Sequence, residues 1–495
     1  MIAGAPPRGD VAWGGLGALG AGVAALLLAT AGRYGYHRDE LYFLRAGREP
    51  AFGYVDQPPF TPLLARAMDA LLPGSLTGLR LPSALAAAAV VLLTGLIARE
   101  LGGGRGAQLL AAASMAVSAV LLAVGHLLST ATFDLLAWTA LTWLLVRALR
   151  DGGGAWIATG AVAGVALQNK LLPLFLLAGM FVAVLAVGPR TVLRTRWPWL
   201  GALVALALWA PHLVWQVANG FPQLALSAAI AGGSSGTSEP WYVLLPFQLV
   251  LVSPLLVPVW ALGWWRLARD PALRTWRAFA VAYVLVAAVF TITGGKPYYL
   301  AGFFPVLLAA GAPPVVAWAR RGARRLRTGV LAAALALSLA MSSVLMLPLV
   351  PEGELAGTPV PAIHYDAGET VGWPAFAATL AAVREQVPAD ERVAVLTGNY
   401  GQAGAVDRFL PSLAPAHSGH NAYWDWGPPP DDAGTLIVVG LPEERLRAWF
   451  GQVRLAARID NGVGLDNDEQ GSPVWIVGER LLPWSQLWPQ LRRLG

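Results

Sequence analysis

Two adjacent carboxylates, Asp39 and Glu40, are the residues whose type and spacing most directly suggest chemistry in this sequence. Neighbouring acids tend to separate in pKa, and an aspartate held where an apolar run meets a polar loop can act as a general base toward a hydroxyl group. In the alternative interpretation both are solvated loop acids that pair with Arg38 or Arg45. The local sequence leaves both interpretations open.

Asp134 is the second candidate acid. It is the only carboxylate between Glu100 and Asp151, and it lies in the apolar and hydroxylated stretch Ser129-Thr-Ala-Thr-Phe-Asp134. An ionisable residue in such surroundings is costly to keep and is usually functional. The alternative is a helix cap, because aspartate is favoured near helix N-termini.

Almost all basic residues are arginines: of the 35 Lys and Arg residues, only Lys170 and Lys296 are lysines. Lys170 follows Gln168-Asn169, and Lys296 lies in Gly294-Gly-Lys-Pro-Tyr-Tyr299. Two isolated lysines at the ends of apolar runs favour point-charge contacts to a phosphate. The alternative is that both side chains extend toward lipid headgroups.

The histidines and the aromatic residues of the tail carry weaker signals. His126 lies at the end of an apolar run, where a hydrogen-bonded structural role is the simpler interpretation. His417 and His420 are separated by Ser418-Gly419, which argues against a helical metal pair, so we predict no metal site from ligand spacing. Tyr423 and Trp424 could stack on a sugar face, although packing is the commoner reason for such residues.

The composition indicates what kind of protein must position these residues. Of 495 residues, 56% are hydrophobic and 13% charged, about half the charged share of roughly 25% in globular domains, and mean hydropathy is +0.55. This composition predicts a membrane protein. The absence of cysteine excludes disulfides and thiolate metal sites.

The charges also divide the chain into two parts. Residues 1–350 carry 25 basic and 11 acidic side chains, whereas residues 351–495 carry 10 basic and 18 acidic ones, a net charge of −8. We therefore expect a membrane domain over 1–350 and a soluble domain over 351–495. The basic residues of the first part lie mostly in short loops between apolar runs, so they predict topology and not nucleic-acid binding.

Apolar runs long enough to approach the ~20 residues of a membrane span recur through the first part. We expect the first to be a span and not a cleaved signal peptide. The predicted spans, about eleven in number, are 11–31, 79–98, 107–125, 131–149, 155–169, 171–188, 197–216, 241–265, 276–294, 298–318 and 328–349.

Arginine placement predicts the topology of these spans. Arginines gather in alternate loops, which the positive-inside rule assigns to the cytoplasm together with the N-terminus. The C-terminal domain is then extracytoplasmic, and the polar segment 32–78 becomes a long first outer loop. The arginine-rich loops are 99–106, 147–154, 189–196, 266–275 and 319–327.

Both outer regions show local structure signals. In the first outer loop, Leu41, Phe43 and Leu44 beside charged residues predict a short amphipathic helix on the membrane surface, followed by the turn Asp56-Gln57-Pro58-Pro59 and a second helix from Pro62. The tail alternates strand-like and helical segments, which predicts a small α/β domain. Its expected strands are 392–396, 435–439 and 474–477, and its expected helices are 374–387 and 442–452.

The first-loop motif Arg38-Asp-Glu-Leu-Tyr-Phe-Leu44 with Gly53-Tyr-Val-Asp-Gln-Pro-Pro59 resembles glycosyltransferase family 39. These dolichyl-phosphate-mannose-protein mannosyltransferase-like integral membrane proteins have the GT-C architecture. Supporting similarities lie at Thr132-Phe-Asp134, Gln168-Asn-Lys170, Asn219-Gly-Phe-Pro222, Lys296-Pro-Tyr-Tyr-Leu300, Gly398-Asn-Tyr-Gly401 and Ser418-Gly-His-Asn421.

The resemblance implies inverting transfer of a sugar from a polyprenyl-phosphate donor to a cell-envelope acceptor at the outer membrane face. Asp39 would be the general base and Glu40 its acidic neighbour, while Asp134 would contact a sugar. The position of Gln57 is usually lysine in the related aminoarabinose transferases, so a phosphate contact is not carried over to it. The expected substrate-binding residues are Arg38, Asp56, Gln57, His126, Asn169, Lys170, Lys296, Tyr298 and Tyr299, with His420, Asn421 and Trp424 as further candidates in the tail.

Other functions remain open at this level. A transporter or flippase of lipid-linked sugars would also need many spans, and it would move the donor without covalent transfer. A carbohydrate-binding tail on a membrane anchor is a third possibility. The sugar, the acceptor and a divalent cation held by Asp39, Glu40 and Asp134 are likewise undetermined.

Overall fold

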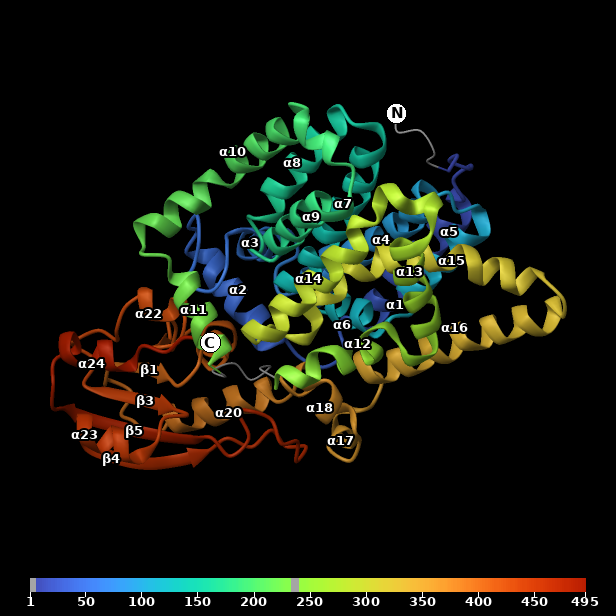
Figure 1. Ribbon diagram of the computed structural model, residues 1–495. Helices are drawn as coiled ribbons and strands as arrows, with labels where there is room; N and C mark the ends of the chain where they lie inside the picture. The colour runs from blue at the N-terminus through green and yellow to red at the C-terminus, as the bar shows by residue number, and fades with distance from the viewer. Residues whose placement is uncertain (1–5, 233–239) are drawn as a thin grey trace. The chain divides into compact units, whose positions relative to one another are not determined.

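The computed structural model describes residues 6–232 and 240–495 (Figure 1). Its backbone contacts group into two compact units. The first unit comprises Met1–Ala31, Arg80–Gly220 and Gly236–Leu347, and the second comprises Gly32–Leu79, Phe221–Ser235 and Pro348–Gly495. The first outer loop thus shares a unit with the C-terminal residues. The sequence division into 1–350 and 351–495 stays a prediction.

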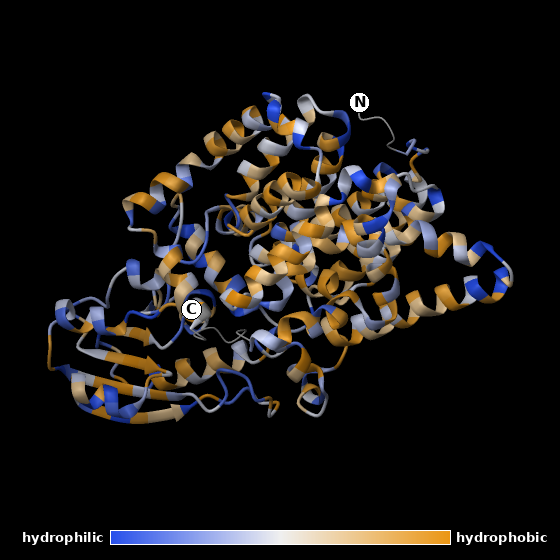
Figure 2. Ribbon diagram, viewed as in Figure 1, coloured by the Kyte–Doolittle hydropathy of each residue, from blue (hydrophilic) through white to orange (hydrophobic). Residues whose placement is uncertain are grey.

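Six helical stretches in the described residues are long and apolar enough to cross a membrane. Figure 2, coloured by residue hydropathy, shows that these helices consist mostly of apolar residues and that the segment joining α15 to α16 is strongly hydrophilic. The six stretches are α1 (Trp13–Thr30), α4 (Leu76–Glu100), α7 (Thr130–Asp151), α10 (Trp197–Ala218), η5 (Pro297–Phe303) continued by α15 (Phe304–Arg320), and α16 (Arg324–Met346).

Two further stretches are bent. The pair α5 (Arg105–Ala116) and α6 (Ala119–His126) bends by 58°. The stretch Trp241–Val252, which contains η2 (Trp241–Val243) and α12 (Leu244–Val252), meets the stretch Pro254–Arg269 at 85°. The second bend lies at Ser253, whose φ of 78° is outside the helical range, and the following Pro254 lacks the N–H that a helix needs.

This unit also contains three shorter apolar helices: α8 (Gly154–Ala166), α9 (Pro173–Val187) and α14 (Ala278–Thr293). Each predicted run therefore coincides with a helix or a bent pair, while the number of spans stays a prediction. The remaining helices of the unit are η1 (Arg190–Arg194), η3 (Pro254–Leu256), α13 (Val257–Arg269) and η4 (Pro271–Trp276).

Glycines allow the helices of this unit to approach closely. A Cβ on Gly160 of α8 would lie 1.9 Å from the carbonyl oxygen of Gly201 on α10, and one on Gly263 of α13 would lie 1.7 Å from that of Leu307 on α15. Small residues permit this backbone contact, as is common where helices pack in membranes. A fully buried aromatic core that includes Trp138, Trp276 and Phe303 fills the space between other helices.

Residues 32–78, the predicted first outer loop, contain the two expected short helices, α2 (Arg38–Arg48) and α3 (Phe60–Leu71). The second begins at Phe60, two residues before the predicted start. The second unit also contains α11 (Pro222–Ala231) and the one-turn helices α17 (Glu352–Leu355), α18 (Val360–Ile363) and α19 (Tyr365–Gly368).

The tail is the predicted α/β fold, built on a five-stranded sheet with strand order β2-β1-β3-β5-β4 (Figure 1). Strands β2, β1 and β3 are parallel, and β5 is antiparallel to β3 and to β4. The strands are β1 (Val393–Thr397), β2 (His417–Ser418), β3 (Thr435–Val439), β4 (Phe450–Arg458) and β5 (Pro473–Arg480), with α20 (Trp373–Arg384), α21 (Tyr400–Phe409), α22 (Ala422–Asp425), α23 (Glu443–Trp449) and α24 (Trp484–Leu491).

One predicted tail element is partly wrong. The helix expected over 442–452 ends at Trp449, and the chain continues at once as β4. This strand was missed because it lies at the sheet edge and much of it is exposed, so its sequence lacks an apolar run.

Candidate functional site

The start of α2 is fixed by its own side chains. Nδ1 of His37 accepts a hydrogen bond from the backbone N–H of Asp39 at 3.2 Å, and the Glu40 carboxylate accepts one from the N–H of His37 at 2.9 Å. This reciprocal arrangement is a capping box. Glu40 is fully buried, so its observed contact is structural, and a catalytic role for it stays a prediction.

Asp39 differs from its neighbour because its side chain remains 37% exposed. It lies in the first turn of α2, and its Oδ1 accepts a 2.7 Å hydrogen bond from the Tyr400 hydroxyl at the start of α21. Burial raises the pKa of Tyr400 well above its usual value, so this hydroxyl keeps its proton and acts as a donor. The other oxygen of Asp39 can thus face a substrate while the carboxylate is held in orientation.

Asp56 is a further candidate acid in the same unit as Asp39. Its Oδ1 accepts a 2.7 Å hydrogen bond from the Tyr42 hydroxyl, and its Oδ2 accepts one from the Asn421 amide at 3.4 Å. Loss of hydrating water through burial raises its pKa to about 7, and the charge of Asp39 adds to the effect. The carboxyl therefore changes protonation state near neutral pH.

Gln57 follows Asp56 and is only 3% exposed. Both Oε1 and Nε2 of its side chain are buried without a hydrogen-bond partner among residues 6–232 and 240–495. A buried amide is expensive to leave unpaired. Gln57 is therefore able to offer one donor and one acceptor to a bound polar group, while its substrate contact stays a prediction.

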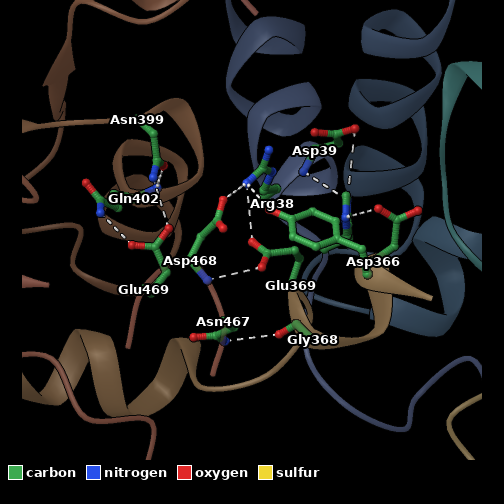
Figure 3. A network of polar contacts seen from close by, with 12 residues as sticks. Arg38, Asp39, Asp366, Gly368, Glu369, Asn399, Gln402, Asn467, Asp468 and Glu469 are labelled. Atoms are coloured by element: carbon green, nitrogen blue, oxygen red, sulfur yellow. Dashed lines mark hydrogen bonds and ion pairs between the residues drawn. The ribbon is translucent and has the colours of Figure 1, made fainter. Parts of the chain in front are cut away.

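Arg38 lies in the polar network of Figure 3, where its guanidinium is directed toward acids from the C-terminal residues. Its Nη1 is 3.3 Å from Glu369 and 2.5 Å from Asp468, and it donates to the Tyr365 hydroxyl at 3.2 Å. Burial raises the pKa of Glu369 to about 7 despite the arginine. Arg38 thus ties α2 to the segments after α19 and before β5, while its predicted substrate contact stays a prediction.

The same network continues to the glycine-containing motif after β1. Glu469 accepts hydrogen bonds from Asn399 at 3.0 Å and from Gln402 at 2.5 Å (Figure 3). The Asn399 side chain also accepts from the N–H of Gln402, which caps α21. These bonds fix the first turn of the helix that presents Tyr400.

The three tail candidates have different positions. Asn421 contacts Asp56 as described, and His420 packs on the Tyr400 ring with centroids 4.7 Å apart. Burial lowers the pKa of His420 to about 3, so its ring is neutral. Trp424 exchanges hydrogen bonds with Trp488 of α24 and joins the core on the sheet, which supports packing as its role.

In the other unit, Asp134, Lys170 and the tyrosine pair form a separate group. The cap of α7 is Ser129, whose side chain accepts from the N–H of Thr132, so Asp134 does not cap the helix. Asp134 is 8% exposed, and its carboxyl group interacts electrostatically with the positive charge of Lys170. The Lys170 ammonium lies 5.1 Å from the Tyr298 ring centroid and 5.3 Å from that of Tyr299.

Asn169 positions this group. Its side-chain amide donates to the carbonyl oxygen of Thr130 at 2.9 Å, which joins the end of α8 to the start of α7. Lys170 itself donates to the Tyr298 hydroxyl at 3.4 Å. Lys296 directly precedes η5, the helix that carries both tyrosines.

His126 lies elsewhere in this unit. Its Nε2 is 3.4 Å from Nη1 of Arg80, which in turn donates to the carbonyl oxygen of Ala31 at 2.7 Å. Both side chains are buried. The contact fits the structural interpretation, and a substrate contact of His126 stays a prediction.

Sequence reasoning missed the hydrogen-bond donors to the candidate acids. Tyr42 and Tyr400 lay inside motifs that the sequence singled out, but nothing local marked them as hydrogen-bond donors to Asp56 and Asp39. Within the described part of the chain, no three His, Asp or Glu side chains lie close enough together to hold a metal ion.

Residues 56–215 match the family described as dolichyl-phosphate-mannose-protein mannosyltransferase. The matched range contains Asp56, Asp134 and Lys170 but ends before Lys296 and begins after Asp39. A comparison with curated protein sequences gave no match.

Solved structures show the same fold. ArnT from Cupriavidus metallidurans in the apo state is 15% identical with a TM-score of 0.60, over 93% of this chain and 97% of that one. The same protein bound to undecaprenyl phosphate gives a TM-score of 0.58 at 15% identity with the same coverage. The arabinofuranosyltransferase AftD from Mycobacteria gives 0.52 at 14% identity, over 94% of this chain and 40% of that one.

These findings confirm the resemblance drawn from the first-loop motif. The chain is a multi-pass helical membrane protein with the GT-C fold and a small C-terminal α/β domain.

Proposed function

We propose that this protein is an inverting glycosyltransferase that moves a sugar from a polyprenyl-phosphate donor to a lipid, glycan or protein acceptor of the cell envelope. The observation that carries the proposal is the carboxylate of Asp39, which is partly exposed and oriented by the Tyr400 hydroxyl at 2.7 Å. The family match and the fold shared with a protein solved in complex with undecaprenyl phosphate support the donor class.

The reaction needs one base. Asp39 accepts the proton of the acceptor hydroxyl. At the same time the hydroxyl oxygen attacks the anomeric carbon of the donor sugar from the side opposite the phosphate. The bond from that carbon to the phosphate oxygen breaks, and its electron pair leaves with the polyprenyl phosphate. A phosphate leaves without a general acid, so the main requirement is neutralisation of its charge.

Lys170 is suited to that neutralisation. Its ammonium is held against the Tyr298 and Tyr299 rings, and Asn169 next to it is fixed to α7. A lysine is a compact point charge that can follow the phosphate as negative charge develops on it. In this proposal Lys296 and Tyr298 share the phosphate, and the buried Asp134 contacts a sugar hydroxyl.

The location follows from the arginine pattern. The proposal places the N-terminus in the cytoplasm, the protein in the cytoplasmic membrane and the C-terminal domain outside it, because arginine-rich loops are retained on the cytoplasmic side. Both Asp39 and Lys170 then belong to outer segments, where a membrane-bound donor meets envelope acceptors.

The test combines cells and purified protein. Mass spectrometry of envelope glycans and glycolipids in a deletion strain should reveal one missing sugar, restored by the wild-type gene and not by Asp39→Asn. The matched control is Glu49→Gln, at the residue that directly follows α2, an exposed acid in an ion pair with Arg45; this variant should restore the sugar.

Proteoliposomes with a labelled polyprenyl-phosphate sugar separate this function from transport. Label appearing on an acceptor supports transfer, whereas movement of intact donor across the bilayer without any covalent product would identify a flippase. An unchanged envelope in the deletion strain would also contradict the proposal.

A further inference from the structure

The C-terminal domain contains a cavity of about 370 Å³ that the proposed reaction does not use. It lies where the parallel strands β1, β2 and β3 end, since its lining includes Thr397 at the end of β1 with Gly398 after it, Gly419 after β2, and Gly440 and Leu441 after β3. Its remaining lining comes from the start of α23 and from the segment that ends α24.

The strand order makes this a favoured place for a ligand. From β1 the chain continues to β2 on one side, whereas from β3 it continues through α23 to β4 and β5 on the other side. The connections therefore diverge between β1 and β3, which are neighbours. In open α/β sheets, ligands bind outside the carboxyl ends of strands at such a switch point.

Glycines keep the strand ends free of side chains. A Cβ on Gly398 would lie 2.9 Å from the carbonyl oxygen of Gly440, and a Cβ on Gly419 would lie 2.0 Å from that of Leu491. Gly440 has a φ of +72°, which other residues rarely adopt. Backbone thus forms much of the wall on this side.

The charged side chains that line the cavity, opposite the glycine backbone, are all positive. Arg445, Arg492 and Arg493 line the cavity and no acid does, although residues 351–495 carry a net charge of −8. None of the three has an ion-pair partner among the described residues, although the charge of Arg492 also acts on Asp425 outside the lining. Arg492 stacks on Trp424 at 4.4 Å.

The backbone that presents two of these arginines is fixed. The N–H of Arg493 donates to the carbonyl oxygen of Gly419 at 2.8 Å, and the N–H of Asn421 donates to that of Arg493 at 3.0 Å. The side chains of Arg492 and Arg493 are exposed, while the Arg493 backbone is hydrogen-bonded to the residues that follow β2. Their guanidinium groups can therefore close on a ligand without rearrangement of the chain.

We propose that this cavity is a binding site for an anionic saccharide, that is, a sugar bearing a phosphate or carboxylate group. Arginine forks match both oxyanions in bidentate geometry. The volume is at the small end of the ~300–1,000 Å³ range of ligand pockets, which suits one sugar with its charged group. The proposal does not rest on the transferase activity.

The test is calorimetric titration of the full-length protein in nanodiscs of zwitterionic lipid with glucose 1-phosphate, glucuronate, glucose and inorganic phosphate. We expect saturable binding of the two anionic sugars at one site, weakened by salt, and at least about tenfold weaker binding of glucose and of phosphate.

The double variant R445A/R493A should weaken binding of glucose 1-phosphate at least about tenfold. The matched control is Arg447→Ala, an exposed arginine on the same helix that pairs with Glu443 outside the cavity, and it should bind as the wild type does. Lys170→Ala should also bind normally, which separates this site from the proposed donor site.

Three outcomes would overturn the proposal. They are absence of saturable binding of both anionic sugars, unchanged binding in R445A/R493A, and inorganic phosphate binding as tightly as glucose 1-phosphate. Each can occur with the transferase intact, so failure here is distinct from failure of the proposed function.

Discussion

The Tyr400 hydroxyl donates a 2.7 Å hydrogen bond to Oδ1 of Asp39, although 361 residues separate them in the chain. Tyr400 opens α21 and Asp39 lies in the first turn of α2. The candidate base of the first outer loop is therefore oriented by a residue of the C-terminal domain.

Removing this hydroxyl tests the orientation. We expect Tyr400→Phe to lower kcat about tenfold, because Asp39 keeps its charge but loses the bond that holds it, while the KM for the donor changes little. Steady-state kinetics with a polyprenyl-phosphate sugar measure both. Tyr34→Phe removes a hydroxyl bonded to the carbonyl oxygen of Val350 and is the control; an equal loss in both variants would contradict a specific role for Tyr400.

Glu40 offers a test that separates structure from catalysis. Glu40→Gln keeps an oxygen that can accept from the N–H of His37, so we expect near wild-type melting and activity, since Gln also completes a capping box. Glu40→Ala should cost about 1–2 kcal/mol of stability. Thermal melting of the detergent-solubilised protein and transfer assays check both. Loss of activity in a well-folded Glu40→Gln variant would instead assign the reaction to this carboxylate.

Lys170 should matter through its charge. We expect Lys170→Met to lower kcat/KM for the donor about 100-fold, the usual effect of removing one group that stabilises developing charge, with Lys170→Arg keeping part of the activity. Tyr298→Phe loses only the 3.4 Å hydrogen bond and should have a smaller effect. If methionine at position 170 left kcat/KM unchanged, the lysine would not contact the phosphate.

Asp56 predicts a pH dependence of stability. Its folded pKa of about 7 exceeds the usual aspartate value because of burial, so the folded state binds this proton more tightly than the unfolded state. Its stabilising contribution is complete below about pH 4 and is lost as the pH rises to about 7, with a slope of at most about 1.4 kcal/mol per pH unit.

Comparison with Asp56→Asn isolates this contribution, since Glu369 titrates in the same range. Between pH 4.5 and 8 the wild-type melting temperature should fall relative to that of Asp56→Asn. Parallel curves for the two proteins would show that Asp56 titrates at the same pH folded and unfolded.

The sequence predicted what is determined locally. The apolar runs became helices, and the charged and apolar pattern around Leu41 gave α2. The edge strand β4 was missed because both of its faces are largely exposed, so its sequence lacks the apolar run that marks a buried strand. The cap of α7 was ambiguous because both Ser129 and Asp134 favour helix starts, and in the structure it is Ser129 that accepts the hydrogen bond from the N–H of Thr132.

The partners of the candidate acids could not be predicted for a different reason. Tyr42 lies 14 residues from Asp56, while Asn421 lies 365 residues from it. Hydrogen bonds between such distant segments depend on the tertiary fold, and no periodicity or motif in one segment specifies its partner in the other.

The grouping of Gly32–Leu79 with Pro348–Gly495 has a consequence for protein engineering. A chimaera that exchanges only the C-terminal domain with a relative would keep Arg38 but lose Glu369 and Asp468, its ion-pair partners. Loss of both anions is destabilising for a cation whose side chain is only 16% exposed. The loop and the domain should be transplanted together, and substitutions at Arg38 and Glu369 should covary among relatives that retain this unit.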